Sequence, residues 1–291
     1  MTHLTVLTNP TAGHAAAQAA EAAIAHLRAR GLTVTHHAAT SAAESHELAQ
    51  EAARTGARGI VAGGDGLVSI ALQAVAATPV ALGVIPIGTG NDCARMLDIP
   101  LSDPVAAAEV IAAGRTRVID AGRIQYHGDT TWFATVVASG FDSLVNDRAN
   151  RMRWPRGRRR YDIAMALEAA KLRPLPFRIE LDDQVIDTDV TLVAVGNGTS
   201  YGGGMRICPG AILDDGLLDV TVVAAGGRLR LLRLSPTVYK GTHVDLPEVS
   251  TFRSRRVRLY AADITAYADG DPVAPLPVDI DVVPAALSVF A

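Results

Sequence analysis

Gly59-Ile60-Val61-Ala62-Gly63-Gly64-Asp65-Gly66 is the stretch that decides the fold. Residues 59–62 are small or apolar and uncharged, which is typical of a short strand buried inside a parallel sheet. Glycines surround Asp65 immediately afterwards, and an apolar-periodic stretch that predicts a helix runs on through Ala77. A strand that ends in a glycine turn and continues as a helix is part of a β–α–β unit, so it predicts an α/β fold.

The same alternation of strand and helix extends on both sides of this stretch. Strands are predicted at residues 4–8, 32–37 and 82–86, and helices follow each of them. Ser41 with Glu44 three residues later is a capping-box signal, and Asp103-Pro104 predicts the start of another helix. We therefore expect residues 1–120 to form an α/β nucleotide-binding domain with a mostly parallel sheet that helices cover on both faces.

The pattern changes near residue 121. Short, alternating, strand-like runs then dominate, and turn residues separate them; they cover residues 123–126, 130–139, 177–181, 185–195, 217–223, 257–260, 264–268, 278–283 and 287–290. One helix is predicted, at about 161–171. Residues 121–291 are therefore predicted to form an antiparallel β-sandwich domain, whose last strand could return to the first domain.

Composition restricts the class of protein. The chain has 291 residues, of which 49% are hydrophobic and 20% charged, so it can bury a sizeable core and global disorder is excluded. A net charge of −3 argues against nucleic-acid binding. Cys93 and Cys208 form no CxxC motif, which fits a reducing cytoplasm. The uncharged run 67–91 contains Pro79 and Pro86, so we expect a soluble protein rather than a membrane span.

Glycine-rich turns follow the first, third and fourth predicted strands: Asn9-Pro10-Thr11-Ala12-Gly13, Gly63-Gly64-Asp65-Gly66 and Gly88-Thr89-Gly90-Asn91-Asp92. In a parallel sheet these turns share the carboxyl edge, where open α/β sheets bind ligands. Glycine lets backbone N–H groups approach phosphate oxygens, and the following helix adds its positive N-terminus. The alternative for each is a plain tight turn. No lysine lies near them, so phosphate charge would fall to backbone amides, a metal, or Arg95 or Arg206.

The second domain carries further glycine and aspartate turns, at 196–198, 202–204, 213–219 and 269–271. Clustered carboxylates beside free backbone carbonyls suit a hard cation such as Mg²⁺. An Asp-Gly pair is also a strong hairpin signal, so a plain β-turn stays open as the alternative for both acidic runs.

Taken together, these motifs resemble the diacylglycerol kinase catalytic-domain family. NPTAG at 9–13, GGDG at 63–66, PIGTGNDCAR at 86–95, the run from GGG to DDGLLD at 202–219 and DGD at 269–271 match the family's order over nearly the whole chain. The family includes bacterial soluble lipid kinases and resembles sphingosine and ceramide kinases. It implies an ATP site between an α/β domain and a β-sandwich, and transfer of the γ-phosphoryl group to a lipid hydroxyl.

The resemblance also implies roles for single residues in nucleotide binding. The three glycine-rich turns would cradle the nucleotide, and Thr40, after the second strand, resembles a family threonine near it. Leu67, Ser69 and Ile70 depart from the family pattern, which has Thr and then an Asn-Glu pair after GGDG. No threonine hydroxyl is therefore expected to contact the nucleotide there.

Metal and base roles follow from the resemblance in the same way. Asp215 resembles the carboxylate of a Mg²⁺ site that the backbone carbonyls of Ile212 and Leu217 complete. Asp269 resembles the general base, in a triplet usually written DGE. Here Asp271 replaces the glutamate, so the choice of base between Asp269 and Asp271 stays open.

A basic stretch at residues 148–160 is a separate feature, with seven arginines at positions 148, 151, 153, 156, 158, 159 and 160. Trp154 lies among them. We predict that it docks on an anionic membrane, since basic residues are attracted to such a surface and Trp favours the interface. A solvated loop and, less favoured, a nucleic-acid site are the alternatives.

The sequence therefore predicts a cytoplasmic ATP- and Mg²⁺-dependent lipid kinase, bound peripherally to the inner face of the membrane. Diacylglycerol is the expected substrate and phosphatidate the product. The alternatives are a kinase for a long-chain base or another lipid alcohol and, from another class, a catalytically silent nucleotide-binding regulator. NAD kinase is disfavoured, and the sequence leaves homodimer formation and acyl-chain preference open.

Overall fold

The structure is a computed structural model that describes residues 3–152, 154–155 and 158–291. Parallel strands form the centre of its N-terminal part, in the spatial order β2-β1-β3-β4. Their bounds are β1 (His3–Thr8), β2 (Thr33–Ala38), β3 (Gly59–Gly63) and β4 (Ala81–Ile85). Apolar side chains of β3 point alternately to the two faces, which is why this stretch reads as continuously hydrophobic.

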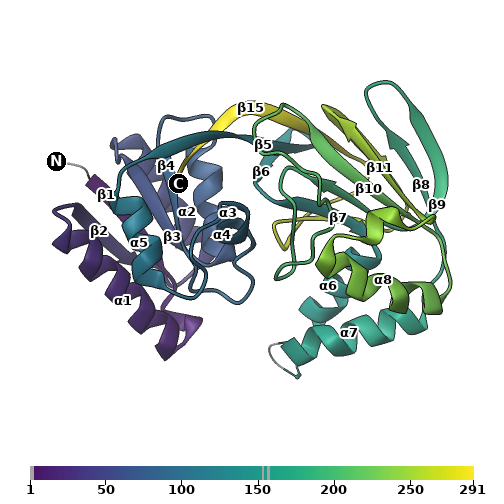
Figure 1. Ribbon diagram of the computed structural model, residues 1–291, viewed down its shortest axis with the longest axis horizontal. Coiled ribbons are helices and arrows are strands. Elements are labelled where there is room, and N and C mark those ends of the chain that lie inside the picture. The colour runs from purple at the N-terminus through teal and green to yellow at the C-terminus, as the bar shows by residue number, and fades with distance from the viewer. Residues whose placement is uncertain (1–2, 153, 156–157) are drawn as a thin grey trace.

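Helices cover both faces of this sheet (Figure 1). On one face, Ile24 and Ile111 pack with Val61, and on the other Leu72 packs with Ile60. The two predicted N-caps are present. Ser41 Oγ accepts a hydrogen bond from Glu44 N at 3.1 Å, and the Asp103 side chain caps the helix that begins at Pro104 in the same way. The helices are α1 (His14–Ala29), α2 (Ala42–Arg54), α3 (Asp65–Val75), α4 (Asp92–Met96) and α5 (Pro104–Ala112), with a 3₁₀ turn at Pro10–Ala12.

Two long strands, β5 (Thr116–Tyr126) and β15 (Val278–Phe290), run from one part of the molecule to the other (Figure 1). They pair antiparallel along most of their lengths. At its end, β15 also joins the first sheet, where Val289 pairs in parallel with Leu82. The two parts are therefore connected by continuous backbone hydrogen bonding as well as by the chain.

The C-terminal part is the antiparallel β-sandwich that the sequence predicts. Its interior contains Phe133, Phe177, Val195 and Leu259, each almost fully buried. The strands are β6 (Asp129–Phe133), β7 (Val136–Gly140), β8 (Leu175–Glu180), β9 (Val185–Gly196), β10 (Leu218–Ala224), β11 (Val249–Ser254), β12 (Arg256–Tyr260), β13 (Thr265–Ala268) and β14 (Asp271–Pro275). Outside them lie α6 (Phe141–Arg151), α7 (Arg158–Ala170), α8 (Arg228–Lys240) and a 3₁₀ turn at His243–Asp245.

Several elements differ from the sequence-based expectation. The strand predicted at 130–139 is divided into β6 and β7, because Ala134 and Thr135 direct their N–H groups at a side chain instead of a ladder. The helices α6 and α8 and the strands β11 and β14 were not predicted. Pro236 lies inside α8, which argues against a helix by local rules, yet Leu234 and Val238 of α8 are buried on the sheet.

In the part of the chain that the structure describes, no helix combines the length and the apolar composition needed to cross a bilayer.

Candidate active site

The three glycine-rich turns leave the sheet at one edge, since β1, β3 and β4 are neighbouring parallel strands. Gly13 and Gly64 precede α1 and α3 with φ values of 97° and 86°, a conformation that favours glycine. Neither helix has a side-chain cap, and a Cβ at Gly13 or Gly66 would meet nothing within 4 Å. These helix starts thus offer uncapped N–H groups beside open space, an arrangement that suits phosphate.

Asp65 joins two of the turns. Its Oδ2 accepts a hydrogen bond from Asn91 N at 2.5 Å, and its Oδ1 accepts one from Asp92 N at 2.9 Å. The amide of Gly88 donates to Asn91 Oδ1 at 2.9 Å, and a Cβ at Gly90 would lie 2.6 Å from Asp65 Oδ2. Burial raises the pKa of Asp65, and the nearby charge of Asp92 adds to this, against the backbone hydrogen bonds. Asp65, in the turn 63–66, therefore fixes the backbone of the turn 88–92.

Asp92 connects this edge to the β-sandwich. Its Oδ2 and Oδ1 accept hydrogen bonds from the amides of Gly203 and Gly204, at 2.7 and 2.8 Å. The side chain of Arg95 donates to Gly90 O at 3.2 Å and lies beside Gly204. The GGG segment of the second part is thus held against the turn 88–92, and Arg95 supplies a positive charge at this junction.

Asp269 lies in a hairpin turn, and its carboxylate points back into the protein. Asp269 and Gly270 have φ values of 49° and 92°, as in the tight turn of a two-residue hairpin. Ala134 N and Thr135 N donate to the carboxylate at 2.9 and 2.8 Å, and the Thr135 hydroxyl donates at 2.6 Å. The DGD triplet therefore forms the hairpin turn and also supplies a carboxylate whose orientation is fixed.

The surroundings of Asp269 bring it near the glycine-rich turns. Burial raises the pKa of the Cys93 thiol in α4, and the charge of Asp269 raises it further. A Cβ at Gly198 would collide with Met96 of α4, so the sandwich packs directly against this helix. Burial also raises the pKa of Asp269, which its hydrogen bonds oppose. The pKa of Asp271 is also raised, first by partial burial of its carboxylate and then by the charge of Asp269.

Two further residues were associated with the nucleotide from the sequence, and both have contacts of their own. Thr40 N and Oγ1 both donate to Glu44 Oε2, at 2.7 and 2.8 Å, so its hydroxyl belongs to the start of α2. β2 is separated from β3 by β1, which places Thr40 beside the turn 9–13 rather than beside Gly63–Gly66. Arg206 packs beside Gly241, at the end of α8.

The carboxylate proposed for Mg²⁺ already has partners within the protein. Asp215 Oδ1 accepts from Leu217 N at 3.0 Å, and its Oδ2 pairs with the guanidinium of Arg253. Across residues 3–152, 154–155 and 158–291, no three His, Cys, Asp or Glu side chains are grouped to hold a metal ion.

Other residues that support this region were not given a role from the sequence. Asp120 is 3% exposed, and its carboxylate accepts from Gly216 N at 2.7 Å and Ala285 N at 2.8 Å. The buried Asn197 amide donates to the carbonyl of Asp120 at 3.1 Å. A charged residue inside an apolar strand could have signalled Asp120. Thr135 offered no signal, because its partner is 134 positions away.

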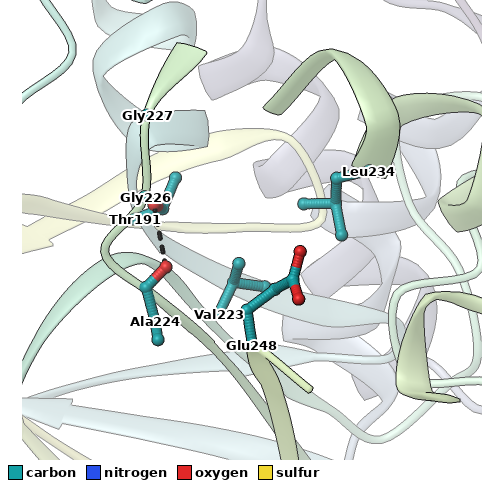
Figure 2. A pocket seen from close by; sticks show the side chains of 7 residues that line it. All are labelled: Thr191, Val223, Ala224, Gly226, Gly227, Leu234 and Glu248. Carbon is teal, nitrogen blue, oxygen red and sulfur yellow. Dashed lines mark hydrogen bonds between the residues drawn. The ribbon is translucent and has the colours of Figure 1, made fainter. Parts of the chain in front are cut away.

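A small pocket lies apart from these residues (Figure 2). It is formed by β9, β10 and the start of α8, and Thr191 Oγ1 donates to Ala224 O at 3.2 Å on its wall. We assign it no part in the site.

Comparison with known proteins agrees with this geometry. Residues 3–124 match the diacylglycerol kinase catalytic domain, and residues 135–291 match the YegS C-terminal NAD kinase beta sandwich-like domain. A Mycobacterium tuberculosis protein named diacylglycerol kinase is 52% identical over 99% of this chain and 94% of its own length. The chain belongs to the diacylglycerol kinase family. It is accordingly a lipid kinase.

More distant members of the diacylglycerol kinase family agree. A YegS-like lipid kinase from Stenotrophomonas maltophilia is 30% identical, covering 90% of this chain and 88% of its own. Two crystal structures from Bacillus anthracis show the same fold, one described as a diacylglycerol kinase. They have TM-scores of 0.81 and 0.73 at 21% and 19% identity, covering 99% of this chain and 95% and 96% of theirs.

Proposed function

We propose that this lipid kinase transfers the γ-phosphoryl group of ATP to the free hydroxyl of diacylglycerol, so that phosphatidate enters phospholipid synthesis. One observation carries the proposal: Asp269 is held beside α4, the helix that follows the turn 88–92. Its donor Thr135 and Met96 of α4 both lie against Gly198. A carboxylate beside a phosphate-binding edge suits attack by a hydroxyl on a phosphorus atom. The 52% identical relative is named diacylglycerol kinase, which supports the choice of acceptor.

The nucleotide enters as MgATP, in which the metal belongs to the substrate and neutralises part of the phosphate charge. The uncapped starts of α1 and α3 offer backbone N–H groups to the phosphates, next to Gly13 and Gly66. Arg95 adds a cation at Gly90. Since no lysine of this chain lies near these turns, we expect backbone amides and Arg95 to hold the triphosphate.

We propose Asp269 as the group that receives the proton. Its carboxylate accepts hydrogen bonds from Ala134 N, Thr135 N and the Thr135 hydroxyl, which fix its orientation for a lipid hydroxyl. As the lipid oxygen bonds to the γ-phosphorus, the bond from phosphorus to the bridging oxygen of ADP breaks. The hydroxyl proton then passes to the carboxylate. The Thr135 and Ala134 donors keep this carboxylate oriented before substrate arrives.

Replacing each carboxylate tests this assignment. We expect Asp269→Asn to lose most phosphate transfer, measured with labelled ATP and diacylglycerol vesicles, while Asp271→Asn keeps much more. The asparagine turns an NH₂ group toward Ala134 or Thr135, so a stability loss of about 1–3 kcal/mol is expected and unfolding must be measured in parallel. Full turnover by a folded Asp269→Asn variant would overturn the assignment, and loss only in Asp271→Asn would transfer the role to Asp271.

A panel of lipid alcohols decides the acceptor. We expect diacylglycerol to be phosphorylated fastest, with long-chain bases and monoacylglycerol as competing acceptors in separate reactions. A preference for a long-chain base would replace the proposed substrate. Absence of transfer to every lipid, with ATP still bound, would favour a silent nucleotide-binding regulator.

We also propose that the enzyme docks peripherally on the cytoplasmic face of an anionic membrane. Arg153 and Arg156 of the basic stretch lie outside the described residues, and Arg148 and Arg151 pair with carboxylates on α7 and α6. Next to them Trp154 is 81% exposed. The helix α7 also carries an exposed arginine, Arg159, and exposed large side chains, which are Tyr161, Ile163, Met165 and Leu167.

Vesicle binding tests this docking. Arg159→Gln should weaken binding to anionic vesicles about fivefold, since one basic residue contributes about 1 kcal/mol there. Leu167→Glu should weaken it further, and added salt should reduce binding of the unchanged protein. The exposed Arg115 of the α/β part offers a matched control, Arg115→Gln. Equal binding to neutral vesicles would contradict the proposal.

A further inference from the structure

Arg253 pairs with the carboxylate of Asp215, the side chain that the sequence predicts for a metal ion. It lies on β11, directly opposite Asp219 of β10 in the antiparallel pairing. Its Nε is 3.5 Å from Asp219 Oδ2, and the other end of the guanidinium pairs with Asp215 Oδ2. One arginine therefore bridges a strand carboxylate and the carboxylate of the turn before that strand.

The rest of the turn is also held by contacts within the protein. The second oxygen of Asp215 accepts from Leu217 N at 3.0 Å, and Gly216 N donates to Asp120 at 2.7 Å. The neighbouring Asp214, which is more exposed, pairs with Arg117 of β5 at 2.8 Å. A protein binds Mg²⁺ through one or two carboxylates at about 2.1 Å, and waters complete the coordination. The Asp215 carboxylate already faces a guanidinium and an N–H donor instead.

We propose that the Arg253 guanidinium takes the place of a resident divalent cation, so that the turn 213–217 is ordered without metal. A guanidinium has several N–H donors in a fixed plane, which lets it contact two carboxylates at once. The bridge carries a positive charge that lies against both Asp215 and Asp219. It does so on a side chain that the fold itself positions, through the Asp219–Arg253 strand pairing.

The position of this turn makes its order important for the fold. Asp120 N donates to Leu213 O at 2.7 Å, so the turn is attached to β5, one of the two strands that join the parts of the molecule. Without Arg253, Asp215 and Asp219 would both lose the cation that they share. Such a pair would then attract a divalent ion from solution, which the unchanged protein does not need.

Thermal unfolding of the full-length protein without nucleotide tests the inference independently of catalysis. We expect the wild type to have the same Tm in EDTA and in millimolar MgCl₂. Arg253→Ala should have a lower Tm in EDTA, and MgCl₂ should restore part of the loss. Arg253→Lys should recover part of it without metal. In Arg253→Ala/Asp215→Asn, the response to MgCl₂ should disappear.

Arg258 on β12 provides a matched control, because its side chain is 45% exposed against 44% for Arg253 and it also pairs with a carboxylate, Asp279. Arg258→Ala should show no response to MgCl₂. A saturable rise in the Tm of the wild type with MgCl₂, abolished in Asp215→Asn, would overturn the proposal. An Arg253→Ala variant that MgCl₂ does not rescue would overturn it too. If that variant does not fold, the wild-type and Arg253→Lys curves still decide.

Discussion

Asp269 combines two properties that follow from one short sequence. Asp-Gly adopts the left-handed backbone of a tight hairpin readily, which fixes the turn between β13 and β14. The carboxylate at that turn then accepts hydrogen bonds from Ala134 and Thr135, at the interruption between β6 and β7. Its orientation is thus set by two backbone irregularities that meet, and both are needed for a proton acceptor that does not move.

The pH dependence of activity follows from this environment. Burial raises the pKa of Asp269 above its ordinary value of about 4, while hydrogen bonds from Thr135 and the backbone lower it. A base must be ionised, so kcat/KM should fall as the pH falls through this raised pKa. Thr135→Val removes one donor to the ionised form and should move the acid limb to higher pH. Pre-steady-state or steady-state profiles of both proteins would measure the shift.

Asp271→Asn is the control for this profile. The Asp271→Asn variant should keep the acid limb where it is, because Asp269 is the proposed base and its pKa is set by burial and by its hydrogen bonds. An unchanged acid limb in Thr135→Val would show that another group titrates.

At the scale of elements, the turns 63–66 and 88–92 form one unit through Asp65. The turn 88–92 is closed by hydrogen bonds between Gly88 and the Asn91 side chain, and the amides of Asn91 and Asp92 attach it to the Asp65 carboxylate. The start of α3 is different, since Gly66 already lies inside the helix with open space beside it. A side chain at position 90 would therefore collide with Asp65, whereas one at position 66 would collide only with a bound ligand.

Replacing these two glycines separates the two reasons. Gly90→Ala should reduce both stability and ATP affinity, because its Cβ would lie 2.6 Å from Asp65 Oδ2. Gly66→Ala should be as stable as the wild type or more so, by up to about 1 kcal/mol, since alanine favours a helix. Its KM for ATP should nevertheless rise, because the added methyl lies where phosphate is expected. Unchanged ATP affinity in Gly66→Ala would mean that the triphosphate does not approach this helix.

The same scale shows how far the sequence predicts this protein. Local signals were sufficient for the first half: the caps at Ser41 and Asp103 form where expected, and strand alternation gives the parallel sheet. Features set by distant contacts were not predictable in this way. The helix α8 contains Pro236, which argues against a helix locally, and it is stabilised by burial against the sheet. The Thr135–Asp269 contact joins residues that are far apart in the chain. Asp215 was predicted from a resemblance, but its partner Arg253 carries no motif.

At the scale of the whole molecule, two kinds of contact connect the α/β part with the sandwich. The paired strands β5 and β15 cross from one to the other and form an extended backbone connection (Figure 1). On the side of the glycine-rich turns, Asp92 accepts the amides of Gly203 and Gly204 at 2.7 and 2.8 Å. The first connection runs along the backbone, whereas the second holds the sandwich against the phosphate-binding edge.

Asp92→Asn should loosen this second connection. An asparagine keeps one oxygen for Gly203 or Gly204 and turns NH₂ toward the other amide, which costs about 1–3 kcal/mol for a donor left without an acceptor. We expect faster hydrogen exchange at Gly203 and Gly204, a raised KM for ATP and little change in β5–β15 protection. Asp98→Asn is the control, because this exposed residue lies just past α4 and the change removes the same charge. It should change neither the exchange at Gly203 and Gly204 nor the KM for ATP. If exchange at Gly203 and Gly204 matches the wild type while KM rises, Asp92 acts on the nucleotide directly, and the closeness of the two parts depends on the strand pair and the packing of α4 against the sandwich.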